Sequence, residues 1–301
     1  MSEESSSYPL QEMIPLLKRW RLPFNRDQAL LTLAAVNIFF LGIDIYLAHN
    51  LNGTVGPNEW IPIIFSPIAG AILLIAGWIA IRNRPAANIT GSITFASCIV
   101  VGVLGSYFHL RRAFLPVAGG GIIIPNEVLL WAPPLLGPLT FLLVAVLGIS
   151  AAWEEDPRGS GNLRLLGSAC IQMPLSKTRA LYLLTALFIL VTVISSVLDH
   201  ARTNFINPWL WLPTFSGLFA TIVAAVMGFL RKPSRGDLWT YAVSLALLII
   251  VGVTGAVLHV NANITGQGAF ILERFLRGAP FLAPLLFANM GMLGFLVLLE
   301  D

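Results

Sequence analysis

The chain contains only four histidines, and each of them lies at the end of a long apolar segment. Ionisable side chains are costly inside a bilayer and are found there mainly where they serve a function. Imidazole is the commonest metal ligand in proteins and a usual axial ligand of haem iron. We therefore interpret these residues as candidate ligands of a haem or of a metal ion. They are His49, His109, His200 and His259.

Two of the histidines follow a pair of glycines at helical spacing. One glycine stands seven residues before the histidine and the other stands four residues before it. Residues at these spacings share one face of a helix, so each histidine ends a stripe without side chains. Such a stripe can admit the flat ring of a porphyrin, or alternatively a closely packed second helix. The glycines are Gly102 and Gly105 before His109, and Gly252 and Gly255 before His259.

Arginines follow two of the histidines closely. Arg111 and Arg112 come after His109, and Arg202 comes after His200. A planar guanidinium can bind a haem propionate through two hydrogen bonds, although a basic residue at the end of a span can also simply anchor it. The sequence thus predicts a b-type haem site at the four histidines. Its further members are Gly105, Gly255, Arg111, Arg112 and Arg202.

A directly bound metal ion is an alternative for the same histidines. Four imidazoles near a symmetry axis, with Glu127 and Glu273 as additional ligands, would suit a Cu, Fe or Zn ion. The two glutamates could instead pair with arginines. Asp44 and Asp199 are candidates for orienting an imidazole. In a third interpretation no cofactor binds, and the histidines are interfacial hydrogen-bonding groups of a transporter, channel or structural subunit.

The composition places these residues in a membrane protein. Hydrophobic residues make up 56% of the 301-residue chain and charged residues only 11%, against about a quarter in soluble domains. Disorder and nucleic-acid binding are therefore excluded as classes. Because the apolar runs are long and do not alternate, we expect eight transmembrane helices. The predicted spans are 28–49, 60–81, 90–110, 127–151, 178–199, 208–230, 238–260 and 276–299.

Charge predicts the orientation of the spans. Most of the 18 Lys and Arg residues precede the first span or follow an even-numbered one. By the positive-inside rule we expect both termini in the cytoplasm and the histidines near the outer face of the cytoplasmic membrane. The arm 1–27 lacks the pattern of a cleaved signal and contains a candidate interfacial helix over 10–20.

The chain repeats itself at a constant offset, which predicts a duplication. Five residues of the first half recur 151 positions later, and the glycine and histidine pattern recurs 150 positions later. We therefore expect an all-α protein with two four-helix repeats, 28–151 and 178–301, joined by a cytoplasmic connection over 152–177. The five residues are His49, Pro57, Trp60, Pro62 and Gly77, which recur as His200, Pro208, Trp211, Pro213 and Gly228.

The layout of two related four-helix halves with histidines near one face resembles that of haem A synthase. That family carries its histidines on even-numbered helices in a Glu-x-x-x-His arrangement. Here the histidines lie on odd-numbered helices without that motif, so no catalytic residue and no membership is assigned from the resemblance. The functional prediction is electron transfer between a quinol, or another membrane redox subunit, and an extracytoplasmic acceptor. The sequence leaves open whether the chain is an enzyme.

Overall fold

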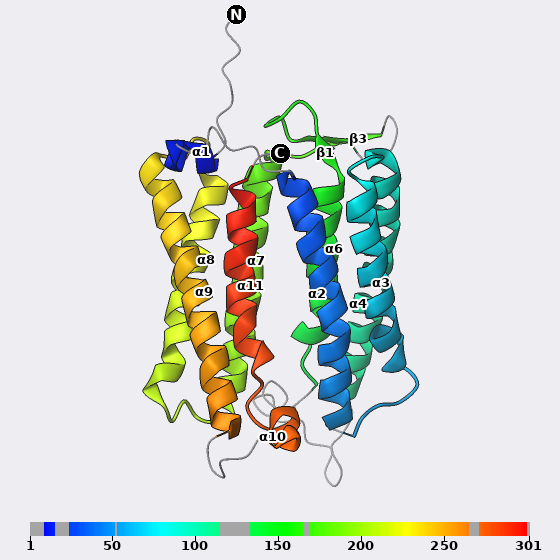
Figure 1. Cartoon of the computed structure of the whole chain (residues 1–301), viewed down its shortest axis with the longest axis vertical. Coiled ribbons are helices and arrows are strands. Elements are labelled where there is room, and N and C mark those ends of the chain that lie inside the picture. Colours follow the sequence, from blue (N-terminus) through cyan, green and yellow to red (C-terminus); the bar gives the residue numbers. More distant parts are fainter. Residues whose placement is uncertain are drawn as a thin grey trace, which may run out of the picture. The chain divides into compact units, whose positions relative to one another are not determined.

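The computed structural model describes residues 9–15, 24–51, 53–114, 133–164, 169–264 and 271–299. Within these ranges the chain is mainly α-helical, with one small β-sheet (Figure 1). The mainly helical chain with its long apolar helices is compatible with the predicted membrane protein, and the small sheet departs from the all-α prediction. The Cα positions divide the chain into two compact units. Unit 1 contains Met1–Leu30, Glu154–Val193 and Leu212–Asp301, and unit 2 contains Leu31–Trp153 and Ile194–Trp211.

Six helices in the described part of the chain are long and apolar enough to cross a bilayer. A helix of 20 residues spans about 30 Å, which is the thickness of the hydrocarbon core. The helices match six of the eight predicted spans, and α4 and α9 extend several residues further at both ends. They are α2 (Arg26–Leu51), α3 (Trp60–Ile79), α4 (Arg84–Ala113), α7 (Lys177–Ala201), α8 (Trp211–Phe229) and α9 (Arg235–Ile264). A short 3-10 turn, Pro208–Leu210, leads into α8.

The fourth and eighth predicted spans are shorter as helices. α6 covers Leu136–Ala152 and α11 covers Leu282–Val297, which gives 17 and 16 residues. The eighth predicted span, 276–299, was wrong as one continuous helix, because α10 (Leu272–Arg277) ends before α11 begins. Proline disfavours helical geometry in the residue before it, and prolines stand just before both helices. Of the predicted fourth span, 127–132 lies outside the described residues.

Close helix packing organises unit 2. Gly70 of α3 lies against Phe39 of α2, where an added Cβ would come within 2.9 Å of the Phe39 Cβ. Gly148 of α6 lies against the ring of Phe95, which is fully buried in α4. α4 begins with the Asn83 side chain accepting a hydrogen bond from the Ala86 amide, and such a cap stabilises a helix start. Small residues therefore set the distances between helices, as is usual in membranes.

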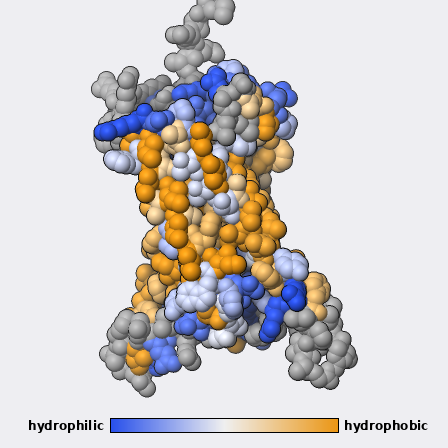
Figure 2. Space-filling view, turned by 90° about the vertical axis from the view of Figure 1, so that its right-hand side faces the viewer, coloured by the Kyte–Doolittle hydropathy of each residue, from blue (hydrophilic) through white to orange (hydrophobic). Residues whose placement is uncertain are grey.

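The apolar side chains on the outside of unit 2 form a band suited to lipid. Ile64 and Ile68 of α3 and Ile93 and Val100 of α4 are exposed. Figure 2 shows this face, where the apolar band separates two more polar ends. An exposed apolar surface of this kind on long helices is what a bilayer contact requires.

In unit 1, α7, α8, α9 and α11 run side by side, and the short α1 (Pro9–Met13) lies at one end (Figure 1). Tyr182 of α7 and Tyr241 of α9 meet edge to face with ring centres 5.0 Å apart, and the Tyr241 hydroxyl donates to the Gly294 carbonyl of α11 at 3.3 Å. The Leu10 amide donates to the Leu298 carbonyl, which ties α1 to the end of α11. Within the predicted arm, the described residues thus include a short helix, and 16–23 lie outside them.

The connection after α6 contains a three-stranded antiparallel sheet that the sequence analysis did not predict. Its strands are β1 (Glu154–Glu155), β2 (Asn162–Arg164) and β3 (Cys170–Gln172), in that spatial order. Glu155 fixes this segment to α7, because its carboxylate accepts hydrogen bonds from the amides of Gly159, Gly161 and Lys177. The connection is therefore structured around one carboxylate.

Buried polar contacts join the beginnings of α2 and α7 within unit 1. Lys177 Nζ lies 2.7 Å from Asp27 Oδ1, and both side chains are almost fully buried. Next to this pair, Arg26 Nη1 donates to Thr178 Oγ1 at 2.7 Å. Arg26 and Lys177 belong to the basic residues from which the orientation of the spans is predicted, and their burial is an additional finding.

Candidate functional site

His49 and His109 form a pair in unit 2. His49 lies in the last turn of α2 and His109 in the last turns of α4. Their ring centres are 6.0 Å apart, and the ring planes are inclined by 72°. The two histidines can pair only because α2 and α4 end at the same level. This common level is expected from the predicted spans.

His109 is held by a carbonyl of the next helix start. Its Nδ1 lies 2.9 Å from the carbonyl oxygen of Pro134, two residues before α6. A carbonyl can only accept, so in a neutral ring Nδ1 carries the proton and Nε2 keeps its lone pair. A backbone carbonyl on one ring nitrogen is the usual way in which a protein orients a ligating histidine through the other nitrogen.

His259 makes the equivalent contact in unit 1. Its Nδ1 lies 3.0 Å from the carbonyl oxygen of Pro280, two residues before α11. The same rule assigns the proton to Nδ1 and the lone pair to Nε2. Asn263, which is buried in unit 1, forms two hydrogen bonds with the backbone of Ala279. The corresponding residue of the first half is Ala113, whose side chain cannot form them.

His49 and His200 are held by hydroxyl groups. The Thr54 hydroxyl lies 3.0 Å from His49 Nδ1 and 3.3 Å from the His49 carbonyl oxygen. When the hydroxyl donates to the carbonyl, it accepts from Nδ1, and Nε2 of His49 keeps the lone pair. His200 Nδ1 lies 3.5 Å from Ser196 Oγ, and its ring lies edge to face with Phe205.

The glycine stripes are filled by prolines of the neighbouring helix. In unit 2 a Cβ added to Gly105 would come within 2.9 Å of Pro138 Cβ on α6. In unit 1 a Cβ added to Gly255 would come within 2.8 Å of Pro284 Cβ on α11. Gly102 and Gly252 are crowded by the same two helices. Of the two interpretations left open by the sequence, these contacts favour helix packing over space for a porphyrin.

The predicted arginines lie at the expected end of the helices. Arg111 and Arg112 are exposed in the last turn of α4. Arg202 Nη1 lies 3.4 Å from Asp199 Oδ1 in unit 2, so this arginine already has a carboxylate partner. Their role as propionate ligands stays a prediction. Glu273 lies on the short α10, and Glu127 lies outside the described residues.

One acidic residue near the histidine pair was not identified from the sequence. Glu59 precedes α3, and its carboxylate accepts a hydrogen bond from the Gly56 amide at 2.9 Å. The carboxylate is close enough to His109 for an electrostatic interaction. Nothing in the sequence marks Glu59, because it has no counterpart at offset 151, where the second half has Leu210. Among the described residues, no group of three or more His, Cys, Asp or Glu side chains is arranged to hold a metal ion.

Comparison with known proteins gives no assignment, because neither a family model, nor a curated protein, nor a solved structure matches this chain.

Proposed function

We propose that this chain is a membrane haem protein that binds a b-type haem between His49 and His109 and transfers electrons. The observation that carries the proposal is the His49–His109 pair with its ring centres 6.0 Å apart. His49 and His109 would be the residues that hold the haem, each through the ring nitrogen that keeps its lone pair.

The donor set fits a haem better than a directly bound ion. Haem supplies four nitrogen ligands of its own, so the protein needs to add only two, whereas a bare Zn, Cu or Fe ion needs three or four protein ligands. Unit 2 brings together two imidazoles whose Nδ1 atoms are occupied by Thr54 and Pro134. When bound, haem supplies one-electron chemistry, and the residues of this chain orient the ligating nitrogens.

We further propose that the chain crosses the membrane eight times as two duplicated four-helix bundles. Support comes from equivalent contacts in the two halves: His109 with Pro134 and Gly105 with Pro138 on one side, and His259 with Pro280 and Gly255 with Pro284 on the other. α6 and α11 rise about 24–26 Å, so each needs a few adjoining residues to complete a span. In this proposal both termini are cytoplasmic, and His200 and His259 are further candidate haem ligands, each considered within its own unit.

The place of the protein in electron transfer follows from the predicted level of the site. Histidines near the outer face of a cytoplasmic membrane would exchange electrons with a quinol or another membrane redox subunit and with an extracytoplasmic acceptor. The exposed Arg111 and Arg112, less than one turn beyond His109 on the same helix, are the proposed propionate partners.

The test is a reduced-minus-oxidised absorption spectrum of the full-length protein in mild detergent, after expression with ample haem. We expect Soret and α bands that are lost in His49→Ala and in His109→Ala. Asn50→Ala is the matched control, because it truncates an exposed neighbour of His49 on the same helix turn and should keep the bands. A wild-type sample without these bands, or histidine variants with bands of wild-type intensity, would contradict the proposal.

A cofactor-free membrane subunit is the second candidate, and the proline contacts favour it. Each of His109 and His259 joins the end of one helix to the start of the next through a proline carbonyl. In that case the wild type contains neither haem nor stoichiometric Cu, Fe or Zn by elemental analysis. His109→Ala and His259→Ala would then lower the melting temperature by similar amounts, since each loses one equivalent hydrogen bond.

A further inference from the structure

Two hollows lie at the end of unit 1 that is farther from His259. Each has a volume of about 360 Å³. The first, here called the lysine hollow, is lined by Pro9, Arg231, Lys232, Pro233 and Leu238. The second, here called the hairpin hollow, is lined by residues that include Ser160, Pro174, Leu175, Ser176, Arg179 and Arg231. Arg231 therefore borders both hollows.

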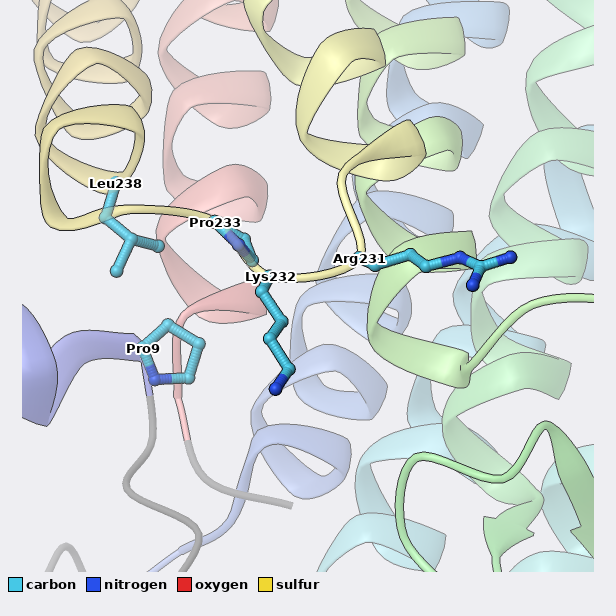
Figure 3. A pocket seen from close by; sticks show the side chains of 5 residues that line it. All are labelled: Pro9, Arg231, Lys232, Pro233 and Leu238. Atoms are coloured by element: carbon cyan, nitrogen blue, oxygen red, sulfur yellow. The ribbon is translucent and has the colours of Figure 1, made fainter.

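The basic side chains at these hollows come from the connection between α8 and α9 and from the start of α7. Figure 3 shows the lysine hollow, in which Lys232 extends on the side of Pro9 while the Arg231 side chain points in the opposite direction, away from Lys232 and Pro233. Arg179 is fixed beside the hairpin hollow, because its guanidinium donates to the carbonyls of Gly228 and Phe229. Among the described residues that line the two hollows, none is acidic.

Two described carboxylates of this end of unit 1 are used by the protein itself. Glu155 accepts three backbone amide hydrogen bonds, which shape the loop that contributes Ser160. Asp237 accepts from both the amide and the hydroxyl of Ser234, each at 2.7 Å. Arg231 and Lys232 form no ion pair in the described part of the chain, and both are exposed. Within the described part of the chain, the hollows therefore combine exposed basic side chains without an acidic partner and open access.

Neighbouring aromatic residues place the hollows at the membrane surface. Trp239 follows Leu238 on α9 and is 44% exposed, and Phe229 at the end of α8 is 70% exposed. Tryptophan gathers at the level of the lipid headgroups. The lysine hollow has apolar walls, formed by Pro9, Pro233 and Leu238, beside a basic side chain. This combination suits the part of a phospholipid where the phosphate is joined to the glycerol backbone.

We propose that these hollows bind the phosphate groups of anionic phospholipids, with Lys232 as the main contact in the lysine hollow and Arg231 in contact with both. The chemistry recognised is a phosphate oxyanion. We assign its source to the lipid because the lysine hollow places apolar residues beside Lys232, and these can contact the rest of a lipid but have nothing to contact in free phosphate. This proposal depends on the bilayer location but not on haem binding.

The test is a titration of the full-length protein in mild detergent with phosphatidylglycerol or phosphatidylcholine, with bound lipid measured by native mass spectrometry. A basic side chain in contact with an anionic headgroup strengthens binding about 5-fold, so we expect Arg231→Gln and Lys232→Gln each to weaken phosphatidylglycerol binding by about that factor. The double variant should lose about 25-fold. Arg82→Gln is the matched control, because Arg82 is exposed in another connection and its loss removes the same charge. It should bind phosphatidylglycerol like the wild type.

Three outcomes would overturn the proposal. The variants at the hollows could bind phosphatidylglycerol as the wild type does, or Arg82→Gln could weaken binding equally. A large excess of inorganic phosphate could also displace the lipid beyond the effect of chloride at the same ionic strength, which would make free phosphate the ligand. The haem spectrum of the same variants distinguishes this proposal from the haem proposal, because it should stay unchanged.

Discussion

Lys177 donates to both carboxylate oxygens of Asp27, at 2.7 and 2.8 Å, and the pair is buried at the start of α7 and α2. At the repeat offset of 151, Arg26 corresponds to Lys177 and Asp27 corresponds to Thr178. The contact from Arg26 to Thr178 therefore joins the same two repeat positions as the contact from Lys177 to Asp27, with the roles of the two repeats exchanged. Such reciprocal contacts are the property of a twofold axis. They provide a further argument for the proposed duplication.

Removing one partner of this buried pair should strongly destabilise the protein. Lys177→Met leaves the Asp27 carboxylate buried without its cation, and the expected loss is about 3–5 kcal/mol. Thermal unfolding of the variants in detergent, followed by circular dichroism, measures the effect. The double variant Asp27→Leu/Lys177→Met should be clearly more stable than either single variant, because no isolated charge of this pair remains. Additive losses in the double variant would contradict a coupled pair.

Adding a methyl group at Gly105 or Gly255 should destabilise the helix pairs α4–α6 and α9–α11. The new Cβ would meet Pro138 or Pro284 at less than 3.0 Å, and overpacking of this kind costs about 1–3 kcal/mol. Gly137→Ala is the control, since nothing lies within 4 Å of the Cβ it would add. The melting temperatures of the three variants provide the measurement. An unchanged value for Gly105→Ala would mean that Pro138 does not fill the stripe.

Glu155 should control the order of the connection between α6 and α7. Glu155→Ala removes the acceptor of three amides, so hydrogen exchange at Gly159, Gly161 and Lys177 should accelerate at least 10-fold, which corresponds to about 1.4 kcal/mol of local opening. Mass-spectrometric or NMR-detected exchange checks this expectation. Glu155→Gln keeps one acceptor oxygen and should have a smaller effect. Equal exchange in all three proteins would show that the carboxylate does not order the segment.

The two cysteines provide a test of orientation. Cys170 on β3 is exposed, whereas Cys98 in α4 is fully buried. We propose that the connection with Cys170 is cytoplasmic. A membrane-impermeant maleimide should therefore label only Cys170, and only after the cytoplasmic face becomes accessible. Cys170→Ser is the control and should not be labelled. Labelling of Cys170 in intact cells would reverse the proposed orientation.

The six long helices could be predicted from the sequence because apolar length alone determines them. The N-terminal ends of α6 and α11 could not be predicted in this way. The sequence stays apolar across Pro134 and Pro280, whereas the helices begin only after these prolines. The sheet β1–β3 was missed for another reason. Its strands have two or three residues, which is too short for alternation to be recognised, and they depend on Glu155.

The candidate site was predictable in its histidines but not in their partners. His49 and His109 were recognised because histidine is rare in this chain and each ends an apolar run. Their partners include a carbonyl oxygen, that of Pro134, and every residue has a carbonyl, so no sequence pattern marks it. The glycine spacing correctly indicated a bare face on the helix, but spacing does not distinguish a cofactor from a neighbouring proline.

The contact between Lys177 and Asp27 also bears on the ancestry that the proposed duplication implies. In a dimer of identical half-length chains, both basic positions would have faced the same kind of residue, so an aspartate opposite one and a threonine opposite the other was impossible. The present asymmetry can arise only after the two copies became independently mutable. The difference between Asp27 and Thr178 would then be younger than the fold that surrounds it.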